Sequence, residues 1–177
     1  MLFRSDGLPR RSAQTVIYQI TDFVIRMMAP IVSFLSEEAY SHFKGKTEDS
    51  VFLLDFPVAP KDWKNEKLAL HFDNLLKVRS EVQKSLEELR AQKIIGSSLE
   101  ATVCIAAEGT VLEDLNKAYD LREFLIVSQV VLKSGPFKIE AGKASGMKCL
   151  RCWVYSSDLG KNPQLPEVCP KCTEALS

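Results

Sequence analysis

The sequence predicts an α+β protein in several parts: the end of a helical bundle, a long helix joined to a small α+β unit, and a four-cysteine ribbon. Three observations support this class. Apolar residues recur at helical spacing from residue 12 to residue 93. Residues 98–141 change to short stretches rich in β-branched residues. Two Cys-x-x-Cys pairs then follow near the end of the chain. We expect domains at 1–62, 63–146 and 147–177.

The first two predicted helices each carry one apolar stripe. Ser12 is a suitable N-cap for the first, which runs over residues 12–28, and Pro30 interrupts it. A second amphipathic helix follows and ends at Gly45. Two helices with a short connection cannot enclose much core. The sequence therefore indicates either the remaining end of a larger bundle or packing of this pair on the rest of the chain.

A connector with two prolines, residues 46–63, leads to a long helix predicted from Asn65 to Lys93. Gly96 is the expected C-cap of this helix. The helix has an apolar seam interrupted by one charge, Arg79, which either contacts a ligand or extends its guanidinium to the edge of the stripe. The seam consists of Leu68, Phe72, Leu75, Arg79, Val82, Leu86 and Leu89.

The middle of the chain predicts a small α+β unit. Residues 98–107 have the alternating, β-rich pattern of a first strand. Within it, Cys104 is expected to be a small buried residue. A short helix over TVLEDLNKAY follows, and a second strand is expected from Phe124 to Lys133. Residues 137–141 suggest a third strand that leads into the ribbon.

The ribbon contains Cys149, Cys152, Cys169 and Cys172, with sixteen residues between the two pairs. Four thiolates at this spacing can occupy the corners of a tetrahedron around Zn²⁺, with Zn–S distances of about 2.3 Å. The alternatives are two disulfides, four unrelated thiols, or iron in the same site. Four protein ligands leave no open coordination position, so we expect one structural Zn²⁺ that supplies folding energy to a segment with little apolar surface.

Composition narrows the class of protein. The 177 residues are 46% hydrophobic and 26% charged, as in ordinary globular domains. Basic and acidic residues number 23 each, which gives no argument for a nucleic-acid partner. No apolar run reaches the roughly 18 residues that cross a bilayer, and MLFRSDGLPRRSAQ lacks the apolar centre of a secretory signal. We therefore expect a cytoplasmic protein with no membrane partner.

Neither the local charge nor a search for catalytic motifs points to a particular function. Five basic residues against Glu140 make residues 133–151 a basic strip, which suits a solvated loop as well as it suits phosphate binding. The sequence has no glycine-rich phosphate loop, no GxSxG and no HExxH, and neither His42 nor His71 has a partner at a suitable spacing. The chain by itself is not expected to be a catalyst.

Taken in order, these segments resemble the C-terminal end of bacterial isoleucyl-tRNA synthetase. RRSAQTVIYQITDFVIRMMAPIVSFLSEEAY is similar to the last two helices of that family's anticodon-binding bundle, and SVFLLDFP is similar to its connector. FDNLLKVRSEVQKSLEELRAQKIIGSSLEA and the closing KCLRCWVYSSDLGKNPQLPEVCPKCTEAL are the more specific parts. Valyl and leucyl relatives share the bundle but do not typically end in this ribbon.

The resemblance implies a whole enzyme that activates isoleucine with ATP and transfers it to tRNA-Ile. In that family the active site lies in a Rossmann domain with HIGH-type and KMSKS-type signatures, and a separate domain edits valine. None of those motifs occurs here, so we expect a non-catalytic fragment that begins inside the bundle. Its expected partners are the anticodon arm of tRNA-Ile and the remainder of the synthetase chain, in a monomeric enzyme. Many family members continue past the last cysteine, whereas this chain stops at Ser177.

For this fragment the resemblance implies contacts to unpaired anticodon-loop bases, which stack on aromatic or guanidinium planes. Trp153 is the first candidate for stacking, although it could instead form the small core of the ribbon. Arg151 and Lys148 would contact phosphates or base edges beside it. Arg79 is a further candidate for the anticodon stem or loop.

Two other functions compete with RNA recognition. The ribbon could be a structural brace for an enzyme's C-terminus without touching RNA. Formamidopyrimidine-type DNA glycosylases also end in a related four-cysteine finger, which grips damaged duplex DNA. Those enzymes require an N-terminal proline nucleophile and a β-sandwich, whereas this chain begins Met-Leu-Phe and its first ninety residues are mainly helical.

Overall fold

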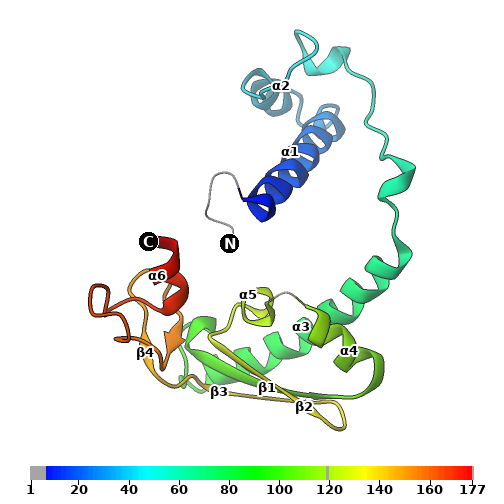
Figure 1. The fold of residues 1–177 in the computed structure, drawn as a ribbon. Helices are drawn as coiled ribbons and strands as arrows, with labels where there is room; N and C mark the ends of the chain where they lie inside the picture. The colour runs from blue at the N-terminus through cyan, green and yellow to red at the C-terminus, as the bar shows by residue number, and fades with distance from the viewer. Residues whose placement is uncertain (1–6, 119, 177) are drawn as a thin grey trace. The chain divides into compact units, whose positions relative to one another are not determined.

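The computed structural model describes residues 7–118 and 120–176, and the chain divides into two compact units, Met1–Lys64 and Asn65–Ser177. Helices make up the first unit, and the second combines helices with two small sheets (Figure 1). This confirms the predicted α+β class. A separate ribbon domain beginning at residue 147 stays a prediction. Within the described ranges, no helix is both long enough and apolar enough to cross a membrane.

The first unit is built from α1 (Leu8–Met28) and α2 (Ser33–Ser41), followed by two 3₁₀ turns, Val51–Leu53 and Lys61–Trp63. The tight link between α1 and α2 contains Pro30, as the sequence predicts. The unit has a small buried core, to which both helices and the first 3₁₀ turn contribute: Ile25, Ala29, Tyr40 and Val51.

Polar side chains tie the chain after α2 back onto that helix. The buried Tyr40 hydroxyl accepts the N–H groups of Thr47 and Glu48, each at 3.3 Å. The Glu37 carboxylate accepts the Ser50 hydroxyl and the Val51 N–H, each at 3.0 Å. These bonds satisfy backbone groups that helical hydrogen bonding does not reach, and they fix the start of the connector.

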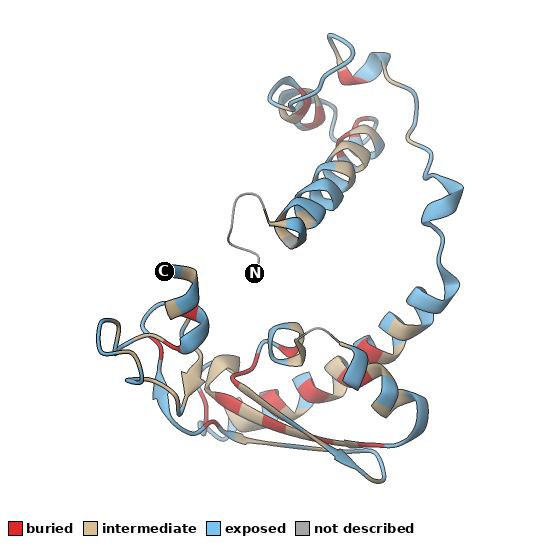
Figure 2. Cartoon of the chain, in the orientation of Figure 1, coloured by how far each residue is buried: buried red, intermediate tan, exposed pale blue. Residues whose placement is uncertain are grey.

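Most of the apolar stripe on α1 and α2 lies on the surface of this unit (Figure 2). Ile17, Ile20 and Leu35 are each more than half exposed, and Phe34 is 94% exposed. The sequence predicts that each stripe must be buried against partners, and the four-residue core of this unit does not achieve that.

The second unit begins with the long helix α3 (Glu66–Ala91), and Asn65 caps it by accepting the Leu68 N–H at 3.0 Å. The predicted C-cap at Gly96 is wrong. The helix ends earlier, at Ala91 with Gln92 as its C-cap, and the next residue, Lys93, adopts a left-handed φ of 57°. The Ile94 N–H bonds back to the Leu89 carbonyl at 3.0 Å, closing the turn without a glycine.

A three-stranded sheet in the order β2-β1-β3 packs beside α3. Strand β1 (Ala101–Ala107) lies at its centre, parallel to β2 (Gln129–Ser134) and antiparallel to β3 (Lys138–Lys143). The crossover from β1 to β2 contains α4 (Gly109–Lys117) and α5 (Leu121–Leu125). The prediction of a strand from Phe124 is therefore wrong, because that residue lies in α5 and the strand starts only at Gln129. A 3₁₀ turn, Ser98–Glu100, likewise precedes β1.

The core of this unit lies between α3 and one face of the sheet (Figure 2). Alternate residues of β1 are buried against the helix, whereas Cys104 is only partly buried on the opposite face, contrary to the expectation for this residue. The predicted seam is correct for Leu75, Val82 and Leu86, which are buried, and Val78 is buried as well. It is wrong for Leu68 and Phe72, which are about half exposed.

The ribbon at the end of the chain is held by a small antiparallel hairpin, β4 (Met147–Lys148) and β5 (Tyr155–Ser156), and by the short helix α6 (Pro170–Leu176). The loop between β4 and β5 carries the first cysteine pair. Beyond the cysteines, Leu159 and Val168 pack against the buried cluster of the ribbon, and both are only partly buried.

Candidate metal centre and nucleic-acid interface

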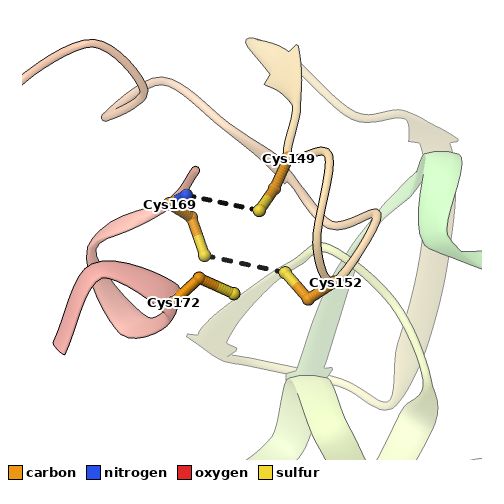
Figure 3. A group of neighbouring side chains, drawn as sticks. All are labelled: Cys149, Cys152, Cys169 and Cys172. Carbon is orange, nitrogen blue, oxygen red and sulfur yellow. Dashed lines mark hydrogen bonds between the residues drawn. The ribbon is translucent and has the colours of Figure 1, made fainter. Parts of the chain in front are cut away.

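The four cysteines converge although they come from two distant loops (Figure 3). Cys149 and Cys152 lie in the turn that follows β4, while Cys169 immediately precedes α6 and Cys172 lies in its first turn. All four sulfur atoms lie within 4.8 Å of one another, and the Sγ atoms of Cys152 and Cys169 are 3.6 Å apart. Among the described residues, this is the one group of three or more His, Cys, Asp or Glu side chains that could hold a metal ion.

Backbone hydrogen bonds shape the first pair into a knuckle. The Trp153 N–H donates to the Cys149 carbonyl at 2.9 Å, and the Cys149 N–H donates to the Val154 carbonyl at 2.9 Å. The Cys169 N–H donates to the Cys149 sulfur at 3.3 Å, so the second loop contributes to the first knuckle. The sulfur positions therefore follow from backbone geometry as well as from side-chain packing.

The thiols differ in their acidity. Burial favours the neutral form of Cys149, but N–H groups of Cys152, Cys169 and Arg151 outweigh it and lower the pKa of the Cys149 thiol from 9.0 to about 6. Burial raises the pKa of Cys152 and of Cys169 above the ordinary value. The backbone N–H groups thus favour the thiolate form of Cys149, and a bound cation would favour the loss of the protons of Cys152 and Cys169.

This arrangement fits a tetrahedral thiolate site. A Zn–S distance of about 2.3 Å places neighbouring sulfurs of a tetrahedron about 3.8 Å apart. The measured separation of 3.6 Å between Cys152 and Cys169 is close to that value. None of the five cysteines forms a disulfide, so the alternative of two disulfides is not realised.

Trp153 directly follows Cys152 and lies on the surface. Its side chain is 60% exposed, so it does not form the core of the ribbon. The Lys148 ammonium lies 5.1 Å from the centre of its ring, within the range of a cation–π contact. Trp153 also adopts a left-handed backbone conformation, with φ of 66°, which is rare for a residue with a bulky side chain. Lys148 and Trp153 form one exposed pair next to the metal ligands.

The other candidate residues occupy different surroundings. Arg151 is exposed within the same knuckle as Trp153. Arg79 lies on α3, where its guanidinium carbon is 5.4 Å from the centre of the Phe124 ring of α5. That contact accounts for the single charge in the apolar seam without a ligand, and it fixes α5 against α3. Arg79 is therefore the weakest of the four candidates.

The basic strip does not form one continuous surface. Strand register places Lys133 and Lys138 in the same row on the outer face of the sheet, whereas Lys143 is in register with Ala101, a residue of the core face. Lys138 also forms a 2.6 Å ion pair with Glu140. The alternative of a solvated segment accounts for these lysines.

A polar cluster that the sequence did not indicate joins α3 to α4. The Asp114 carboxylate of α4 accepts the Asn74 amide at 2.7 Å and lies 2.8 Å from Nδ1 of His71, both on α3. Hydrogen bonds from Asn74 and then from His71 hold the pKa of Asp114 below its ordinary value of 3.8. Because forty or more residues separate the partners, no local spacing could predict this cluster.

Two family models match the sequence. Residues 2–105 match the model described as the anticodon-binding domain of tRNA ligase. Residues 146–175 match the model described as the zinc finger found in FPG and IleRS. The second match spans all four clustered cysteines, and together with their geometry it indicates that this segment binds zinc.

Three similar curated relatives share one name. Isoleucine–tRNA ligases of Carboxydothermus hydrogenoformans, Syntrophotalea carbinolica and Geobacter sulfurreducens are 41%, 38% and 37% identical to this chain, over 97%, 98% and 98% of its length. The matched region is 20% of the length of each relative. The chain thus spans about a fifth of the curated relatives that it matches.

Proposed function

The chain belongs to the family of anticodon-binding domains of tRNA ligases, and we propose that it is the part of an isoleucine–tRNA ligase that holds the anticodon arm of tRNA-Ile. The exposed Lys148–Trp153 pair beside the four cysteines is the observation that carries this proposal. A flat aromatic ring held on a stiff knuckle offers a stacking platform for an unpaired base, and the ammonium beside it suits a phosphate.

The proposal assigns one structural Zn²⁺ to Cys149, Cys152, Cys169 and Cys172. Their number and convergence support a closed site with no position for substrate. In this role the metal orients Trp153, Arg151 and Lys148 but takes part in no reaction. Arg79 would join the interface only if the RNA displaced it from Phe124.

The longer protein would attach isoleucine to tRNA-Ile with ATP, through domains other than those described here. The exposed apolar stripe of α1 and α2 would pack against further helices of the bundle in that longer chain. We infer a monomeric, cytoplasmic ligase, in line with the expectation from the sequence. Elution of the longer chain as a dimer would contradict the monomeric state.

A salt-controlled binding titration tests the proposal. The zinc-loaded chain is titrated with tRNA-Ile and, in parallel, with the same tRNA carrying a swapped anticodon. Tighter binding of the cognate anticodon at fixed ionic strength is the expected result, because phosphate contacts alone cannot distinguish the two RNAs. Equal binding of both would reject anticodon recognition and favour the structural brace. Preference for a damaged DNA duplex over both RNAs would favour the glycosylase-type finger.

A further inference from the structure

We propose that Ser128 is a positioning residue for the RNA-binding surface: its buried hydroxyl holds the β4–β5 hairpin, and with it Lys148 and Trp153, at a fixed orientation on the α+β unit. This inference rests on the proposed function. Ser128 lies between α5 and β2, far in sequence from the ribbon, and neither family match includes it.

The Ser128 side chain connects three separate segments of the second unit. Its residue is only 2% exposed. The hydroxyl oxygen accepts the Tyr155 N–H of β5 at 2.7 Å, and the hydroxyl proton is donated to the Leu99 carbonyl in the turn before β1. The Ser128 N–H also donates to the Ala101 carbonyl at 3.1 Å. One small side chain therefore joins the ribbon to the edge of the sheet.

A short path leads from Tyr155 to the proposed binding surface. Tyr155 is in register with Lys148 in the β4–β5 ladder. Two residues before Tyr155, Trp153 makes the hydrogen bond to Cys149 that closes the knuckle. A hairpin of two-residue strands has little stability of its own. The bond from Ser128 thus fixes β5. The strand paired with it, β4, carries Lys148 of the exposed pair.

Two neighbouring features hold the same hairpin in the same place. The Gln129 amide donates to the Ser145 carbonyl at 2.9 Å and accepts the Ser145 N–H at 3.3 Å. Gly146 has φ of 93°, and a Cβ there would lie 2.4 Å from the Ser156 carbonyl carbon. The chain entering the ribbon is therefore confined on both sides. Of the side-chain hydrogen bonds made by Ser128 and Gln129, the one from the Tyr155 N–H to Ser128 reaches β5, the strand that follows Trp153.

The position requires a hydroxyl. The Tyr155 N–H needs an acceptor and the Leu99 carbonyl needs a donor, and a hydroxyl satisfies both at once. Alanine would remove both of these part-buried hydrogen bonds, so the hairpin would shift until water or other groups satisfied the two backbone groups. The four cysteines and their backbone hydrogen bonds do not involve Ser128, so the variant should keep its metal.

The test compares Ser128→Ala with Ser134→Ala, the same change at an exposed position of β2. Zinc content and far-ultraviolet circular dichroism are measured first, and tRNA-Ile affinity is then measured at a temperature where both variants are folded. We expect full zinc in both. The affinity of Ser128→Ala should fall by about tenfold, the scale of a displaced stacking contact, and that of Ser134→Ala should not change.

A double-mutant cycle separates positioning from general loss of stability. If Ser128 acts through Trp153, adding Ser128→Ala to Trp153→Ala should change affinity by less than about twofold, because the contact that it positions is already gone. An unchanged affinity of folded Ser128→Ala, or an equal loss in both backgrounds, would overturn the inference. A wild-type chain that does not bind tRNA-Ile would instead reject the proposed function itself.

If Ser128→Ala does not fold, amide hydrogen exchange on the wild-type chain provides the test. The Tyr155 amide should be protected to the same degree as the amides of β1, because its acceptor belongs to that rigid unit. Exchange of Tyr155 as fast as that of exposed loop amides would overturn the inference.

Discussion

A tryptophan in the left-handed region is the least expected residue of this chain. The knuckle needs a positive φ at position 153, because the N–H of that residue turns back to the Cys149 carbonyl. Glycine meets this need without steric cost, whereas other L-residues pay roughly 1–2 kcal/mol. Strain of this kind is concentrated at functional sites. Trp153 therefore lowers the stability of the ribbon, and its ring is exposed instead of adding to the core.

In Trp153→Gly, we expect tRNA affinity to fall while the stability of the ribbon rises. Trp153→Gly and Trp153→Ala should both lose about 1–3 kcal/mol of tRNA affinity, because both lack the ring. Only Trp153→Gly relieves the strain, so its ribbon should be about 1 kcal/mol more stable than that of Trp153→Ala. Chelator competition for zinc at fixed pH measures this difference, since metal affinity includes the folding energy of the ribbon.

Leu150→Ala provides the control, because Leu150 is an exposed apolar residue of the same knuckle. It should change neither quantity. Equal zinc affinity in the glycine and alanine variants at position 153 would show that the left-handed conformation carries no cost there.

At the scale of elements, α3 and the central strand β1 each contribute four buried residues to the core of the second unit. Leu86 is 1% exposed and lies in the core with Ile105 and Leu125. Leu86→Ala should lower the free energy of unfolding of this unit by about 2–5 kcal/mol, through lost burial and the cavity left behind. Denaturant unfolding followed by circular dichroism measures the loss. Leu76→Ala, on the exposed side of the same helix, should cost much less.

The polar link between α3 and α4 makes a pH-dependent contribution. Because the folded pKa of Asp114 lies below 3.8, the bonds to Asn74 and His71 stabilise the fold above that pH. Their contribution is lost as the pH falls through the lowered folded value. Asp114→Asn should therefore melt at a lower temperature than the wild type at pH 6, and the difference should shrink towards pH 3. A difference that is constant over this range would contradict the role of the charge.

The elements also show where sequence patterns suffice. Periodicity predicts α1, α3 and the central strand, because each has a regular apolar face. It does not predict α5, since five residues give too little repeat and β-branched neighbours favour a strand. The C-cap of α3 could not be predicted either, because the chain turns at Lys93 through a left-handed φ and a hydrogen bond from the Ile94 N–H to the Leu89 carbonyl, and not at a glycine.

The sequence likewise predicts one part of the candidate site and not the rest. The spacing of the two Cys-x-x-Cys pairs predicts that the four cysteines share a metal site, because such pairs have few other uses. The exposure of Trp153 could not be deduced, since a ribbon core and a stacking platform require the same residue type. The contacts of Arg79 with Phe124 and of Ser128 with Tyr155 join segments that the sequence separates, so only the folded arrangement reveals them.

At the scale of the whole molecule, the buried clusters of the α+β unit and of the ribbon differ in how they are stabilised. The α+β unit has a core of twelve buried residues, whereas the cluster in the ribbon consists of Cys149, Cys169 and Cys172. Apolar burial can hold the first without help. The second has too little apolar area, and without a cation its thiols leave only weak contacts.

Metal removal should therefore unfold one part of the molecule and spare the rest. After chelation, amides of the ribbon should lose protection from hydrogen exchange, while those of β1 and α3 keep theirs. Cys149→Ser should have the same effect without chelator and should abolish stoichiometric zinc, because it removes one of the four thiolate ligands. Cys104→Ser, outside the cluster, is the matched control and should keep its zinc. Full zinc content in Cys149→Ser would contradict the ligand set, and loss of protection in β1 on chelation would mean that the α+β unit depends on the metal for its own stability.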